Sequence, residues 1–252
     1  MRVLAVDRQD EPLRALESAI AKKHGAGWIR SLALDLCAAG ANERIVDAAV
    51  SQFGALDVLV NNAGIGMGSI RSDNWNNLLR FWEVEPDQWQ RLFAVNSTAT
   101  FLLSRLAVPH MLEQGWGRIV NITTSLGSMI RRGYAPYGAS KAAAEALSSV
   151  MAYDLEGTGV TANVLVPGAV TNTPMVPDAS GFDRTQLLQP EAMVPPLLFL
   201  LSDQANAVNG QRFLAVHWDR SLPIAEAIAK AGAPVAWRSI ATMPIFPTAR
   251  GQ

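Results

Sequence analysis

Short apolar segments alternate with amphipathic helical patterns along most of this chain. The apolar segments have the length and the β-branched content of buried strands, and they lie at residues 3–6, 29–34, 56–60, 118–123, 160–166 and 213–216. Between them, apolar residues recur at helical spacing, as Leu13, Leu16 and Ile20 do. Parallel strands need long crossover connections, so this alternation predicts a parallel sheet with helices on both faces, a three-layer α/β/α fold.

Length and composition exclude several classes of protein. A chain of 252 residues fits one α/β domain, and its 49% hydrophobic content can fill a large core. The formal net charge of -1 argues against nucleic-acid binding. The single cysteine, Cys37, excludes an internal disulfide. No apolar run reaches the ~18 residues of a membrane span, and the start lacks a signal-peptide core. We expect a cytoplasmic protein without a membrane partner.

The segment Tyr137-Gly138-Ala139-Ser140-Lys141 carries the clearest chemical signal. A Tyr and a Lys four residues apart on a helix share one face, with Cβ atoms roughly 6 Å apart. An ammonium near a phenol favours the phenolate, so we expect Lys141 to lower the pKa of Tyr137. A Tyr placed in this way can donate and accept a proton during a reaction.

Other motifs surround this pair in a recognisable order. They are Asn61-Asn62-Ala63-Gly64 after the third strand, Asn96 in a long helix, Thr123-Thr124-Ser125 after the fourth strand, and Pro167-Gly168 after the fifth. Together they resemble the short-chain dehydrogenase/reductase family, over residues 1–216. The resemblance implies a Rossmann-like, doubly wound sheet. Residues 217–252 are then a C-terminal extension packed on the same domain, with Trp237 as a candidate anchor.

One part of the family pattern is missing from the sequence. Family members begin with a central strand and a Gly-rich turn that approaches the cofactor pyrophosphate. Here Met1 stands where the second strand of the family begins. Without the central strand, its two neighbours lie ~10 Å apart, which is two strand spacings. We expect either that the printed sequence is part of a longer chain, which we favour, or that the protein is truncated and does not bind cofactor.

The resemblance assigns four catalytic positions. Tyr137 is the general acid/base, Lys141 holds the nicotinamide ribose, and Asn96 anchors a water in a proton relay. The fourth position, which usually holds a Ser that bonds the substrate oxygen, falls on Thr124 when counted from either Tyr137 or Asn96. Ser125 is the alternative, and because neighbouring side chains at a strand end point to opposite faces, the two residues are not interchangeable.

The resemblance also implies contacts with the cofactor. Asp7 takes the position that reads the adenosine ribose, where its charge favours NAD over NADP, although the neighbouring Arg8 could pair with a 2′-phosphate. The other implied contacts are Asp35 and Leu36 at the adenine, Asn62, Ala63 and Gly64 along the adenosine, Pro167 and Gly168 at the nicotinamide amide, and again Tyr137 and Lys141. No metal-ligand spacing is present.

The expected activity is hydride transfer between a nicotinamide and an alcohol or ketone. The alternative is a catalytically silent member of the family that acts as a binding or oligomeric scaffold, and an isomerase or dehydratase of the same fold is a third reading. A long segment at 65–85 and a loop at 174–189 are expected to shape the pocket for a small-molecule substrate. The resemblance implies a homo-tetramer or homo-dimer.

Overall fold

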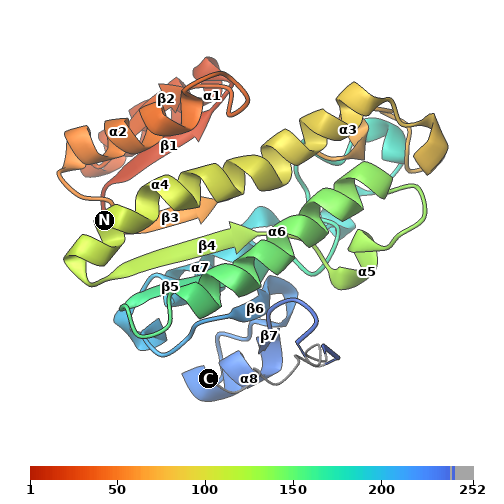
Figure 1. Ribbon diagram of the computed structural model, residues 1–252. Coiled ribbons are helices and arrows are strands. Elements are labelled where there is room, and N and C mark those ends of the chain that lie inside the picture. The colour runs from red at the N-terminus through yellow and green to blue at the C-terminus, as the bar shows by residue number, and fades with distance from the viewer. Residues whose placement is uncertain (239, 242–252) are drawn as a thin grey trace, which may run out of the picture.

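The computed structural model describes residues 1–238 and 240–241 and has three layers of helices and strands (Figure 1). The strands in this part of the chain are β1 (Val3–Asp7), β2 (Ile29–Ala33), β3 (Val58–Asn61), β4 (Gly117–Ile122), β5 (Val160–Val166), β6 (Gln211–Leu214) and β7 (Gly232–Pro234). The α-helices are α1 (Asp10–His24), α2 (Ala41–Phe53), α3 (Pro86–Phe93), α4 (Ala99–Gln114), α5 (Leu126–Met129), α6 (Ala135–Asp154), α7 (Val194–Leu200) and α8 (Ile224–Ala231).

The strands form two separate sheets. β1 and β2 pair in parallel as one sheet, and the other follows the order β3-β4-β5-β6-β7. Its pairs are parallel except for β6 and β7. The predicted strands are all present, with ends displaced by up to a few residues; the segment predicted at 213–216 is β6, because residues 215–217 turn into a short helix. The Rossmann-like fold class is confirmed.

A slot separates β1 from β3, which belong to different sheets. A cavity of about 1040 Å³ is lined by residues of both strands, including Leu4, Val6, Val58 and Val60. Alternate residues of β1 bond to its neighbour β2. Asp7 is one of them, because its carbonyl accepts from the N–H of Leu34 at 2.8 Å. The alternation of a parallel ladder therefore turns the backbone groups of Leu4 and Val6 toward the slot. This geometry agrees with the predicted gap at the centre of the sheet.

Helices cover the larger sheet on both faces. α4 and α6 contact β3, β4 and β5 on one face, and α7 contacts β4 and β5 on the other (Figure 1). The continuous helical run Pro86–Gln114 is long and apolar enough to cross a bilayer, although from the sequence we expected no segment of this kind. Half of its most apolar window is buried inside the fold, where α4 contacts α2 and the sheet, so its packing is that of a core helix.

The C-terminal extension adds an edge to the larger sheet. α8 leads into β7, which pairs with β6, and Val235 is fully buried beside β5. Val235 is the fully buried residue of this segment, whereas Trp237 is 37% exposed. That Trp237 anchors the residues after it stays a prediction. The rest of the predicted extension, residue 239 and residues 242–252, lies outside the described residues.

Candidate active site

The predicted catalytic residues meet at the carboxyl end of β4. Helix α6 is held along this strand by three side-chain bonds. The Nδ2 of Asn121 donates to Ser148 at 2.8 Å, the Nζ of Lys141 donates to the carbonyl of Ile122 at 2.9 Å, and Thr123 donates to Glu145 at 2.6 Å. These bonds fix the rotation of α6, which begins just before Tyr137. They therefore place Tyr137 beside the last residues of β4.

Thr124 is the partner of Tyr137. The side chain of Thr124 lies close enough to the Tyr137 hydroxyl to oppose the rise in the pKa of Tyr137. Ser125 instead stands at the start of the short helix α5, where its carbonyl accepts from the N–H of Ser128 at 2.8 Å. Of the two residues that the sequence left open, Thr124 is the one that lies at the Tyr137 hydroxyl.

Burial moves the pKa values of both members of the Tyr–Lys pair. It raises the pKa of Tyr137 above its usual value, and the Thr124 hydroxyl only partly offsets this. Burial also lowers the pKa of Lys141 to about 8, since the side chain is only 4% exposed. The expected lowering of the Tyr137 pKa by Lys141 is not found, because the Lys141 ammonium is directed to the carbonyl of Ile122.

Asn96 lies in a π-helical turn, Ala94–Thr98, between α3 and α4. Its side chain bonds the backbone of Ile65 twice, accepting from the N–H and donating to the C=O, each at 2.9 Å. It also donates to the hydroxyl of Ser140 at 2.9 Å, and Ser140 donates to the carbonyl of Tyr137. Ser140, which is usually a packing residue at this position in a helix, thus links Asn96 to the Tyr137 turn. Its place within the Tyr137–Lys141 segment was the only signal for it in the sequence.

Two glycines allow these groups to come together. A Cβ on Gly64 would lie 3.2 Å from the Nζ of Lys141 and 3.3 Å from the Oδ1 of Asn96. A Cβ on Gly138 would lie 2.2 Å from the carbonyl oxygen of Met129, which is closer than real contacts allow. Gly64 therefore sits against Asn96 and Lys141, and Gly138 lets α5 pack directly on the first turn of α6.

The residues predicted to contact adenosine line the large cavity. Asp7 and Asp35 follow β1 and β2, and the other members are Leu36, Asn62, Ala63 and Gly64. The N–H of Cys37 and then the guanidinium of Arg91, at 2.8 Å, hold the pKa of the Asp35 carboxyl below its usual value. Asp7 accepts from the N–H of Gln9 at 2.9 Å. Arg91 was not identified from the sequence, because its partner lies 56 residues away in the chain.

The two segments predicted to shape the substrate pocket are in contact. Trp75 packs edge-on against Phe182, with ring centroids 4.9 Å apart, and against Tyr134 at 6.1 Å. Tyr134 in turn packs against Tyr137 at 5.9 Å. A line of aromatic rings thus runs from the 174–189 loop, through the 65–85 segment, to the candidate catalytic Tyr. Neither segment could be linked to the other from sequence.

The backbone turn after β5 lies at the same end of the sheet. Pro167 follows the last residue of β5, and its carbonyl accepts from the N–H of Val216 at 3.0 Å. Gly168 has a φ of 87°, and a Cβ there would lie 2.5 Å from a Val216 methyl carbon. The turn is therefore held close to the end of β6. Among residues 1–238 and 240–241, no group of three His, Cys, Asp or Glu side chains could hold a metal ion.

Comparisons with known proteins agree with this geometry. A family model described as short chain dehydrogenase matches residues 1–182. A short-chain type dehydrogenase/reductase of Picea abies is 35% identical over 67% of this chain and 62% of its own length. The chain thus spans under two thirds of that relative. A 2-(S)-hydroxypropyl-CoM dehydrogenase 3 of Xanthobacter autotrophicus is 36% identical over 77% of this chain and 75% of its own length.

Solved structures with nicotinamide nucleotides have the same fold. A gluconate 5-dehydrogenase from Burkholderia cenocepacia, in complex with NADP and tartrate, has a TM-score of 0.70 at 27% identity, over 84% of this chain and 82% of that chain. A 3-ketoacyl-(acyl-carrier-protein) reductase from Brucella melitensis, complexed with NADH, has a TM-score of 0.71 at 27% identity, over 84% of this chain and 85% of that chain. The family match, the relatives and the fold agree, and the chain belongs to the short-chain dehydrogenase family.

Proposed function

We propose that this protein is an oxidoreductase that moves a hydride between a nicotinamide nucleotide and a carbinol or carbonyl carbon. The single observation that carries this proposal is the meeting of Tyr137, Thr124 and the buried Lys141 at the carboxyl end of β4. Two hydroxyl groups placed together can bind one substrate oxygen, and one of them can transfer its proton. The nicotinamide, when bound, supplies or accepts the hydride.

Each residue has a separate task in this proposal. Thr124 orients the substrate oxygen, and Tyr137 gives its proton to that oxygen during reduction or removes it during oxidation. Lys141, whose ammonium donates to the carbonyl of Ile122, holds the ribose hydroxyls of the nucleotide. Asn96, whose side chain bonds the Ile65 backbone and Ser140, holds the π-helical turn in place and anchors the water of the proton relay.

The residues present fit the two ends of a nicotinamide dinucleotide. At the nicotinamide end, Gly64 keeps open a close approach to Lys141 and Asn96. At the adenosine end, Asp7 and Asp35 line the cavity with carboxylates that accept hydrogen bonds from a ribose or an adenine. Asp7 would repel a 2′-phosphate, so we propose NAD as the preferred cofactor, with NADP as the weaker one.

For the pyrophosphate, the described residues offer no Gly-rich turn that opens a helix at the slot between β1 and β3. The slot is bordered by the backbone groups of Leu4 and Val6 that face away from β2. We propose that residues 1–216 form one domain of the family and that residues 217–252 extend it. A cytoplasmic homo-tetramer or homo-dimer is part of the same proposal. The comparisons do not favour a scaffold role.

The proposed substrate class rests on the rings that continue from Tyr137. Tyr134 packs against the Tyr137 ring, Trp75 packs against Tyr134, and Phe182 packs against Trp75, so apolar ring surface extends away from the candidate catalytic Tyr. We propose a small to medium, partly apolar secondary alcohol or ketone. An isomerase or dehydratase of the same fold would instead convert its substrate without net change in the nucleotide.

The test is a panel of secondary alcohols and ketones of increasing apolar size, assayed with NAD(H) and NADP(H). Turnover is followed by the absorbance of the reduced nicotinamide, and products are identified by mass spectrometry. Stoichiometric conversion of nucleotide and substrate is the expected result. Product formed without change in the nucleotide would indicate an isomerase or dehydratase, and no turnover with a bound nucleotide would reject the proposed activity.

A further inference from the structure

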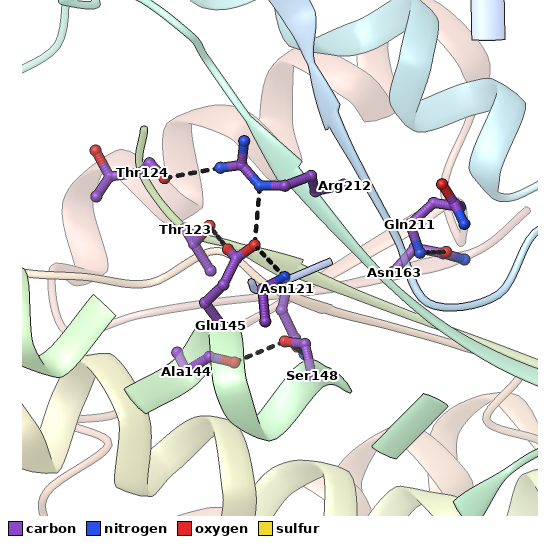
Figure 2. A network of polar contacts seen from close by, with 10 residues as sticks. Asn121, Thr123, Thr124, Ala144, Glu145, Ser148, Asn163, Gln211 and Arg212 are labelled. Carbon is purple, nitrogen blue, oxygen red and sulfur yellow. Dashed lines mark hydrogen bonds and ion pairs between the residues drawn. The ribbon is translucent and has the colours of Figure 1, made fainter. Parts of the chain in front are cut away.

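A buried ion pair lies directly behind the candidate catalytic residues. Glu145 is fully buried on α6 and Arg212 is 5% exposed on β6, and they contact each other at 2.9 Å (Figure 2). Glu145 stands one helical turn after Lys141 and two turns after Tyr137, so all three share one face of α6. The pair is separated by 67 residues in the chain and lies outside the set of residues to which the proposed reaction assigns a role.

The guanidinium of Arg212 uses two of its three nitrogens for two different contacts. Its Nε donates to the Oε1 of Glu145 at 2.9 Å, while its Nη2 donates to the carbonyl of Thr124 at 3.2 Å (Figure 2). Arg212 thus ties the backbone of Thr124 to the helix that carries Tyr137. The other carboxylate oxygen of Glu145 accepts from Thr123 at 2.6 Å, so the residue before Thr124 is fixed as well.

The C-terminal extension closes this network from a third side. The N–H of Ala236 donates to the Oε1 of Glu145 at 3.1 Å. Ala236 has a φ of 58°, a left-handed conformation that non-Gly residues rarely adopt, and it is the only non-Gly residue with positive φ in the described part of the chain. Val235 beside it is fully buried, and Arg238 donates to Ser149 of α6 at 3.1 Å. The strained turn is therefore anchored on both sides by buried contacts.

We propose that Glu145 and Arg212 are positioning residues that hold the Thr124 hydroxyl at Tyr137 and that couple this alignment to the C-terminal extension. The inference deepens the proposed oxidoreductase function and rests on it for the roles of Thr124 and Tyr137. A buried ion pair contributes little to stability compared with well-packed apolar residues. What it provides here is a rigid fork, because a guanidinium can bond a carboxylate and a carbonyl in one fixed plane.

Arg212→Lys is the most informative variant. A Lys keeps the positive charge beside Glu145 but has a single ammonium, which cannot reproduce both contacts of the fork. We expect kcat to fall ~10–100-fold, as for a small misplacement of a reacting group, with the KM for the nucleotide unchanged. Because the Thr124 hydroxyl lowers the pKa of Tyr137, its misalignment should also move the pH midpoint of Tyr137 upward.

Asn163→Ala is the matched control. Asn163 is 1% exposed on β5, and its side chain bonds Val208 at 2.7 Å and the N–H of Gln211, next to Arg212, at 3.0 Å (Figure 2). Its loss should loosen the same pair of strands without touching Thr124. We expect a fall in stability with an unchanged kcat and an unchanged pH midpoint. If Asn163→Ala changes kcat and the pH midpoint of Tyr137 as much as Arg212→Lys does, the role of Arg212 is only structural and the proposal is overturned.

A readout that needs no substrate separates this proposal from the proposed function. The ionisation of Tyr137 is followed by ultraviolet absorbance during a pH titration. The curve of each protein, wild type or variant, is corrected by subtracting the curve of the same protein with the additional substitution Tyr137→Phe. An upward shift in Arg212→Lys supports positioning even where no substrate is turned over. An unchanged midpoint overturns it. Should Arg212→Lys fail to fold, the double variant Glu145→Met with Arg212→Met, which replaces the pair with apolar side chains, is judged by the same two outcomes.

Discussion

The two sheets of this protein differ in how completely their backbone and side chains are paired. In the larger sheet, β5 is buried along its whole length, as is β4 up to its last residue, and the polar side chains at their ends bond one another. In the smaller sheet, β1 is exposed at both ends and half-buried between them, and its inner edge faces the slot. The candidate catalytic residues sit at the end of the buried strand β4 and on α6, and the two adenosine-facing carboxylates, Asp7 and Asp35, sit at or just after the ends of β1 and β2.

This difference indicates that the two sheets contribute to different parts of the proposed function. Proton transfer needs groups held to within a fraction of an ångström, and a fully packed sheet supplies that rigidity. Recognition of the distant adenosine tolerates more movement, since its purpose is affinity and cofactor choice. Substitutions in the larger sheet should therefore change rate, and those in the smaller sheet should change nucleotide binding.

The largest expected effect is that of Tyr137→Phe. Removing the hydroxyl takes away the proton donor and acceptor, so kcat should fall ~10²–10⁴-fold. Nucleotide binding should change little, because the predicted adenosine contacts, at the ends of β1, β2 and β3, are all residues other than Tyr137. Steady-state kinetics and calorimetric titration of NADH check both parts. Wild-type turnover in this variant would show that another group moves the proton.

Lys141→Met should lower activity and raise stability together. Burial lowers the pKa of Lys141 from 10.5 to about 8, so the native state binds fewer protons than the unfolded state. The loss of stability caused by burying the Lys141 ammonium is therefore complete below pH 8, and it disappears as the pH rises through 10.5, the pKa of Lys141 in the unfolded chain. The variant should gain ~2–3 kcal/mol in free energy of unfolding at pH 7, and less as the pH approaches 10.5. Denaturant titrations at several pH values measure it, and a gain independent of pH would contradict the burial argument.

Asp7→Asn tests the smaller sheet. It removes the charge that repels a 2′-phosphate and keeps the shape of the side chain, so the preference for NADH over NADPH should fall ~10-fold. The ratio of the two dissociation constants is the measurement. Asp10→Asn is the matched control, because Asp10 pairs with Arg14 on the exposed side of α1. An equal change in both variants would assign the effect to net charge alone.

The smallest expected effect is that of Asp35→Asn. The N–H of Cys37 and then the guanidinium of Arg91 hold the pKa of Asp35 below its usual value. The side chains of Asp35 and Arg91 are both more than a third exposed, so their ion pair contributes less than ~1 kcal/mol. A carboxyl whose pKa is lowered by folding stabilises the fold at pH values above its pKa in the unfolded chain. This stabilisation is lost as the pH falls and the carboxylate of the folded protein becomes protonated. The difference from wild type should therefore be present at pH 7 and vanish in acid. A loss of several kcal/mol would place Asp35 in the rigid part of the molecule.

Much of the fold and part of the site could be predicted from the sequence. Buried parallel strands are short apolar runs, so β1 to β6 were found, and counting from Tyr137 placed Thr124. Contacts between distant segments carry no local pattern, which is why Trp75 with Phe182 and Glu145 with Arg212 were not anticipated. The direction of the Tyr137 pKa shift was also missed, because helical spacing shows that Lys141 is near but not that burial outweighs its charge.

We propose that the region of β4 and β5, which holds the candidate catalytic residues, is rigid, that the sheet of β1 and β2 is looser, and that a bound nucleotide joins the two. Native-state hydrogen exchange with and without NADH tests it most directly. Without nucleotide, amides of β1 and β2 should exchange at a markedly lower opening free energy than those of β4 and β5. With NADH, protection should rise in β1, β2 and the turn at Asp35. Equal protection of both sheets without nucleotide, or no gain in β1 and β2 with it, would contradict the account.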